Sequence, residues 1–151
     1  MKIPKDCSVR LSLGLTAVFF LVLLAAAFFM PHFVRLIAPV SRLGAGEWTC
    51  FWLMAGGYLT LVFSALADGL LFRLLLLVAR GEVFTPPAVG CIRGVSWCCF
   101  AVSLLFAVLS RFFLMAWVIC WAAVLLGLCL RVVKNVIEEA TTIKAENDLT
   151  V

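Results

Sequence analysis

The chain has 151 residues, of which 66% are hydrophobic and only 13% are charged. A soluble domain is roughly 45–50% apolar and about 25% charged, so this composition does not suit a fold surrounded by water. The formal charge of +4 is not gathered on a separate polar domain, which argues against direct nucleic-acid binding. Composition and length together predict one all-α integral membrane domain over residues 1–151.

The first apolar run covers residues 11–30 without a charge. It is long enough to cross the ~30 Å hydrocarbon core of a bilayer as a helix. A secretory signal is the alternative, because Ala25-Ala26-Ala27 resembles a cleavage site. The apolar part of a signal has only about 7–15 residues, however, so we expect an uncleaved span. Pro31 is expected to end this helix and to begin a loop that reaches Glu47.

The second span is predicted over residues 48–68, continuing as helix to residue 80. Trp48 and Trp52 begin it, as aromatic residues do at a membrane interface. No strong helix breaker occurs before Gly81, which is a suitable C-terminal cap. The second helix should therefore be unusually long.

Thr85 and Pro86 predict the start of the third helix, because threonine is a good N-cap and proline suits the first helical position. From residue 95 to residue 130 the only charge is Arg111. One helix of that length would measure about 54 Å, nearly twice the hydrocarbon thickness. We therefore expect two spans, over about 92–110 and 112–130, joined near Ser110 and Arg111.

The polar tail, residues 131–151, keeps apolar residues at helical spacing, which predicts an amphipathic extension of the fourth helix. Orientation follows from the positive-inside rule. With both ends inside (N-in/C-in), nine Lys and Arg residues lie in the cytoplasm and three lie outside, namely Arg35, Arg42 and Arg111. Three spans would give six on each side. The prediction is four transmembrane helices in the cell membrane, with a cytoplasmic extension of the fourth.

Catalytic and metal-binding patterns are missing from the sequence. His32 is the only histidine and has no acid or second histidine at a metal-ligand spacing. No phosphate-binding loop, nucleophile elbow or zinc-protease motif occurs. Six of the seven cysteines lie in apolar runs or in predicted cytoplasmic segments, and Cys50 borders the outer face without a nearby exterior partner, which favours packing over disulfides. We expect no enzymatic activity, no metal and no cofactor.

A stripe of small and polar residues at a spacing of four runs along the second helix: Gly56, Thr60, Ser64 and Asp68. With Arg73, it predicts a ligand-binding site, because ionisable residues near a membrane interior are often functional. Two alternatives stay open. Small residues also serve plain helix packing, and Asp68 at the end of the span suits an interfacial anchor.

A partner surface is predicted on the cytoplasmic side. It comprises the turn residues Phe84 and Thr85 and the tail residues Val136, Ile137, Glu138 and Glu139. The apolar tail positions need cover in water, either from the end of the second helix or from another protein. The acidic residues suit a basic partner, although a solvated helix end explains the same charges.

The turn Gly81-Glu82-Val83-Phe84-Thr85, the four spans and the ending Glu146-Asn147-Asp148-Leu149-Thr150-Val151 resemble the bacterial family labelled domain of unknown function 2975. The resemblance covers essentially the whole chain. It implies a small multi-pass protein encoded beside short helix-turn-helix regulators, and it supplies no catalytic residues.

These observations favour a regulatory or sensory membrane subunit that acts through a cytoplasmic partner, with a helix-turn-helix regulator or a second copy of the chain as candidates. A small transporter or ligand-binding bundle centred on Asp68 is one alternative. A structural or protective membrane subunit is the other.

Overall fold

The computed structural model describes residues 5–44, 46–81 and 84–148, which form helices and turns without β-strands. Glu82, Val83 and the last three residues, which belong to the predicted turn and tail, lie outside these ranges. The elements are α1 (Lys5–Ile37), the short 3-10 helix η1 (Ala38–Val40), α2 (Glu47–Ala79), α3 (Pro86–Leu109) and α4 (Met115–Asp148). Each α-helix is long and apolar enough to cross a membrane, which confirms a helical multi-pass fold.

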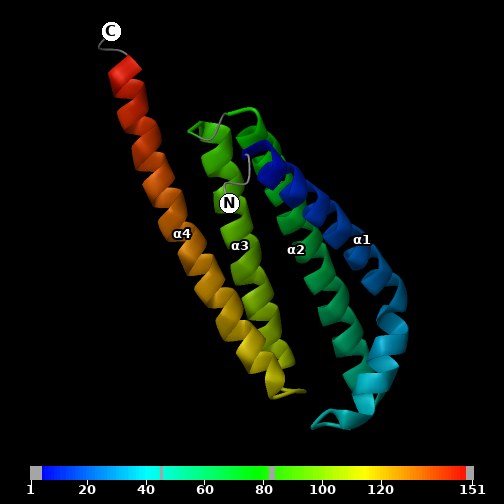
Figure 1. Ribbon diagram of the computed structural model, residues 1–151. Coiled ribbons are helices and arrows are strands. Elements are labelled where there is room, and N and C mark those ends of the chain that lie inside the picture. Colours follow the sequence, from blue (N-terminus) through cyan, green and yellow to red (C-terminus); the bar gives the residue numbers. More distant parts are fainter. Residues whose placement is uncertain (1–4, 45, 82–83, 149–151) are drawn as a thin grey trace.

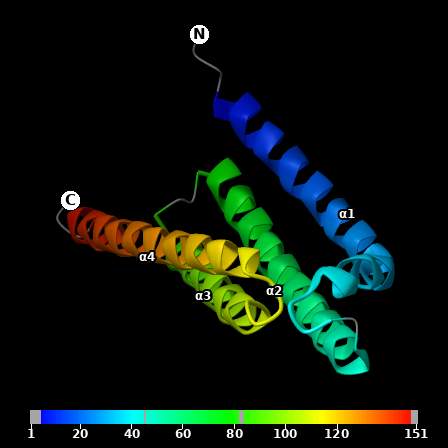
Figure 2. The same ribbon diagram turned by 90° about the horizontal axis from the view of Figure 1, so that it is seen from below.

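The four α-helices form an open row (Figures 1 and 2). Over the described ranges, α1 packs on α2, α2 on α3 and α3 on α4, and no other pair of these four helices is in contact. The beginning of α1 and the end of α4 lie at one end of the row, here called the terminal end. The connections α1–α2 and α3–α4 lie at the other, the hairpin end. Because the row does not close, large apolar side chains such as Phe28, Val62 and Leu125 face outward, where lipid covers them.

Helix α1 continues through Pro31 to Ile37, so the prediction that Pro31 ends the first helix is wrong. Proline has no N–H group, and the carbonyl of Ala27, four residues earlier, therefore loses its helical donor. The Tyr58 hydroxyl on α2 donates a hydrogen bond to the Ala27 carbonyl oxygen at 3.4 Å. A neighbouring helix thus satisfies the backbone group that proline leaves without a donor, which is how membrane helices tolerate proline.

The extra turns of α1 and the adjoining η1 contribute to a small core at the hairpin end. Val34 and Ala38 pack there with Leu53 of α2 and with Phe112, which lies in the connection between α3 and α4. The Arg42 backbone N–H donates a hydrogen bond to the Phe112 carbonyl at 3.1 Å, so the two hairpins are joined directly. The predicted turn near Ser110 is confirmed, although α4 begins at Met115 rather than at residue 112.

The boundaries at the terminal end follow the local sequence. Helix α2 ends at Ala79, and Gly81 takes a φ of +78°, a conformation that glycine adopts without strain. Thr85 is the N-cap of α3 and Pro86 its first residue, as the sequence predicts. The long second helix is confirmed as well.

Close contacts fix the register between neighbouring helices. A methyl group on Gly94 of α3 would lie 2.6 Å from Leu70 Cδ1 of α2, so these two residues lie side by side. Ser96 Oγ of α3 donates a hydrogen bond to the Gly127 carbonyl of α4 at 2.9 Å. A methyl group on Gly127 would lie 3.2 Å from the Phe100 ring, so the absence of a side chain permits this approach.

Candidate functional site

Asp68 is the buried carboxylate of α2, with 6% of its surface exposed. It lies in a cleft of about 480 Å³ between α1 and α2. Apart from Asp68 and Thr16, the cleft is lined by apolar residues: Ala17, Phe20, Leu21, Gly69 and Phe72. The Thr16 hydroxyl donates to the Leu13 carbonyl at 2.9 Å, within its own helix. The cleft therefore presents one carboxylate in apolar surroundings.

The structure does not gather the predicted stripe around this cleft. A step of four residues rotates the direction of a side chain by about 40°, because a helix has 3.6 residues per turn. Three such steps, from Gly56 to Asp68, add up to about 120°. Gly56 accordingly faces Leu109 of α3, and the Thr60 hydroxyl donates to the Gly56 carbonyl at 2.8 Å. Of the five predicted ligand-site residues, Asp68 alone lines the cleft, and the Arg73 side chain is exposed.

The register places Asp68 toward the terminal end of the row, about 4.5 Å inward of the level of Arg93. Because Leu70 lies beside Gly94, Asp68 lies at the level of Ser96 in the antiparallel neighbour α3. Arg93 and Arg111 are 18 residues apart on either side of that level, about 27 Å at 1.5 Å per residue. This length matches the ~30 Å hydrocarbon core. Asp68 is five residues, about 7.5 Å, from Arg73 in the direction of the hairpin end.

Residues 131–148 of α4, here called the stalk, carry an exposed apolar face. Val132, Val136 and Ile143 are 63%, 61% and 54% exposed, and we call them the stalk stripe. Helix α2 does not cover the stripe, since α4 packs on α3 alone among the described helices. Of the other predicted partner residues, Phe84 and Glu139 are exposed, whereas Thr85 and Ile137 are half-buried.

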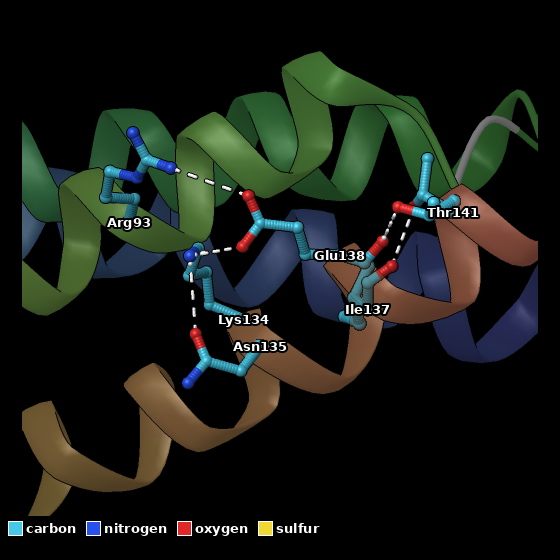
Figure 3. Close-up of polar contacts among 7 residues, drawn as sticks. Arg93, Lys134, Asn135, Ile137, Glu138 and Thr141 are labelled. Atoms are coloured by element: carbon cyan, nitrogen blue, oxygen red, sulfur yellow. Dashed lines mark hydrogen bonds and ion pairs between the residues drawn. The ribbon is translucent and has the colours of Figure 1, made fainter.

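Glu138 of the predicted partner surface is engaged within the fold (Figure 3). Its carboxylate pairs with Lys134 one turn earlier and lies 3.7 Å from Arg93 Nη2 of α3. The hydrogen bond from Lys134 lowers the pKa of Glu138 below its ordinary value, and the charges of Lys134 and Arg93 act in the same direction. The interaction with Arg93 ties the stalk to α3.

A second pocket, of about 250 Å³, lies between α3 and α4 near the terminal end. It is lined by Arg93, Ser96, Trp97, Arg131, Lys134 and Asn135. The sequence alone does not predict this site, because its residues come from two segments about 40 positions apart. The available signal was that Arg93 and Arg131 each border an apolar run on adjacent helices.

In the described part of the chain, no three His, Cys, Asp or Glu residues come together as a metal site would require. The six cysteines whose side chains are described are free thiols: Cys50, Cys91, Cys98, Cys99, Cys120 and Cys129. The model of a family described as "Protein of unknown function (DUF2975)" matches residues 9–151. Neither the comparison with curated proteins nor that with solved structures gave a match.

Proposed function

We propose that this chain, which belongs to the DUF2975 family of proteins of unknown function, is a regulatory or sensory membrane subunit without catalytic activity that acts through a cytoplasmic protein. The observation that carries the proposal is the exposed stalk stripe. Inside a bilayer, lipid covers such a face. Beyond the bilayer, a row of uncovered Val and Ile side chains marks a surface on which another molecule packs.

The orientation rests on charge. Toward the terminal end, α1 carries Arg10, α2 carries Arg73 and is followed by Arg80, and the α3–α4 pair adds Arg93, Arg131 and Lys134. At the hairpin end the cationic residues are Arg35, Arg42 and Arg111. Positive charge is retained on the cytoplasmic side of a cell membrane, so the terminal end and the stalk face the cytoplasm.

The border of the stripe supports a protein partner over a lipid surface. Glu139 and Glu146 are seven residues apart and fall on the same side of the helix as Val132, Val136 and Ile143. Helices that lie on membranes carry Lys and Arg beside their apolar face, because the inner leaflet is anionic. An apolar face with carboxylates along one edge suits an amphipathic helix that has a basic edge. A helix-turn-helix regulator is a partner of this kind.

Site-specific photocrosslinking in cells tests the proposal. A photoreactive amino acid at Val136 or Ile143 is expected to capture one cytosolic protein, while the same group at Thr142 should not, because Thr142 is exposed about 100–120° around the helix from these two residues. Val136→Asp should abolish the crosslink from position 143, and the matched change Thr142→Asp should preserve it. Crosslinks to lipid alone, to a second copy of the chain, or equally from both faces would contradict a cytosolic partner.

The buried carboxylate supports a second candidate, a small transporter or ligand-binding bundle. An ionisable side chain at the level between Arg93 and Arg111, with an apolar cleft around it, is suited to carry a proton or a cation. Proteoliposomes with an internal pH-sensitive dye test this function. The transporter function would be favoured if the parent shows proton flux, Asp68→Asn abolishes that flux and Ser64→Ala preserves it. Equal dye traces for the parent and both variants would leave Asp68 without a transport role.

A further inference from the structure

Cationic side chains from two helices line the pocket between α3 and α4. Arg93 comes from α3, and Arg131 and Lys134 come from α4. The pocket of about 250 Å³ has room for a phosphate group and part of its substituent. Neither the stalk stripe nor the Asp68 cleft includes these three residues.

The cations are held in position before any ligand arrives. The Arg131 guanidinium carbon lies 5.2 Å from the centre of the Trp97 ring and 5.5 Å from that of Phe100. A guanidinium stacked on aromatic rings is weakly hydrated and keeps its N–H groups available for an oxyanion. The Lys134 side chain is only 17% exposed, and its ammonium donates to Asn135 Oδ1 at 3.3 Å.

The charges around the pocket do not balance. In the described ranges, Glu138 is the one carboxylate paired with these cations, through Lys134 and Arg93. Arg131 contacts aromatic rings instead of an acid. Three cations beside one carboxylate leave two positive charges in excess, which favours an anionic ligand.

We propose that this pocket binds a phosphate oxyanion, of the kind that the headgroup of an anionic phospholipid presents. Arg93 marks one edge of the 27 Å layer between Arg93 and Arg111, where headgroups begin. Trp97, Leu104 and Val108 are exposed and follow Arg93 at helical spacing on one face of α3. Acyl chains of a lipid whose phosphate occupies the pocket would lie along that face. Basic pockets between membrane helices recognise lipid headgroups in this way.

Binding to the full-length chain, delipidated in a neutral detergent, tests the proposal by calorimetry. The probes are short-chain phosphatidylglycerol, phosphatidylcholine with the same chains, and inorganic phosphate. Arg131→Gln with Lys134→Gln should weaken phosphatidylglycerol binding by roughly 30-fold, about fivefold for each cation. The control pair Arg10→Gln and Arg80→Gln removes two exposed arginines of the terminal end away from the pocket and should leave binding unchanged. Glu138→Gln removes the competing carboxylate and should strengthen binding.

The outcomes separate the two sources of phosphate. We call Arg131→Gln with Lys134→Gln the pocket pair. If the parent prefers phosphatidylglycerol over phosphatidylcholine and the pocket pair, but not the control pair, loses this preference, the ligand is a lipid headgroup. Binding of inorganic phosphate without lipid preference, again lost in the pocket pair alone, identifies a soluble phosphate compound. Equal losses in the pocket and control pairs, or no binding of any probe to the parent, would overturn the proposal. Arg131→Lys with Lys134→Arg keeps both charges but loses the stacked guanidinium, so it should bind more tightly than the pocket pair and less tightly than the parent. A pocket pair that unfolds in mixed micelles as the parent does excludes misfolding as the cause of its loss.

Discussion

Replacement of Gly127 by leucine should separate α4 from α3. The backbone of Gly127 lies against the Phe100 ring, where even a methyl group would approach to 3.2 Å, and its carbonyl accepts the Ser96 hydrogen bond. Overpacking of a close contact costs about 1–3 kcal/mol. Loss of an interhelical hydrogen bond in a membrane protein adds about 0.6 kcal/mol. These losses make Gly127→Leu about 2–3 kcal/mol less stable than a glycine-to-leucine change at an uncrowded helix position. Against the parent we expect a decrease of about 1–2 kcal/mol in the free energy of unfolding, because leucine itself gains about 1 kcal/mol over glycine in a helix.

Gly14→Leu is the matched control, because no atom lies within 4 Å of the position that a Cβ would take at Gly14. Unfolding in mixed micelles of neutral detergent and dodecyl sulfate, followed by tryptophan fluorescence, measures both variants. Gly14→Leu should match or exceed the parent, since leucine is about 1 kcal/mol better than glycine in a helix. Ser96→Ala should lower the free energy of unfolding only by the contribution of the hydrogen bond to Gly127. Equal stability of Gly127→Leu and Gly14→Leu would refute the α3–α4 packing.

Three further predictions concern other contacts. Tyr58→Phe should lower the free energy of unfolding by about 0.6 kcal/mol in the parent. In a Pro31→Ala background it should lower it by almost nothing, because the introduced alanine supplies the helical N–H. Equal decreases in both backgrounds of this double-mutant cycle would contradict the role given to Tyr58. Phe112→Ala should lower the free energy of unfolding in mixed micelles by about 3 kcal/mol, whereas Phe28→Ala, at an outward position, should lower it much less. Similar decreases for the two variants would argue against the core at the hairpin end. The lowered pKa of Glu138 means that its pairing stabilises the stalk above pH 4.5 and is lost as the pH falls through the lower folded-state value. The protection of the stalk amides against hydrogen exchange, taken relative to the intrinsic exchange rate at each pH, should decrease there, and Glu138→Gln should remove that decrease.

The fold could be predicted from the sequence where local chemistry decides it. Apolar length predicts four helices, and Gly81, Thr85 and Pro86 predict the end of α2 and the start of α3. The continuation of α1 through Pro31 was not predictable, because the compensating Tyr58 lies 27 positions away on another helix. Local spacing carries no information about such a contact.

The sites, like the fold, could be predicted only where residues near in sequence determine them. A spacing of four predicts that Gly56 and Asp68 share a helix face, but the accumulated rotation turns them toward different neighbours. The basic pocket depends on the register of α3 against α4, which the Ser96–Gly127 hydrogen bond and the Phe100 contact fix. Neither segment alone predicts that Arg93 and Arg131 line one pocket. The exposed stalk, in contrast, follows from apolar spacing that continues beyond Arg131.

The central claim is that the stalk stripe lies in the cytoplasm beneath a protein partner. Labelling of single cysteines at Val136 and Thr142, in a chain without its native cysteines, tests it most directly with a membrane-impermeant maleimide. In intact cells neither position should react. In inverted membrane vesicles position 142 should react at once, and position 136 only after a wash that removes peripheral proteins. Labelling of position 136 in intact cells, or equal rates at both positions in unwashed vesicles, would contradict the account.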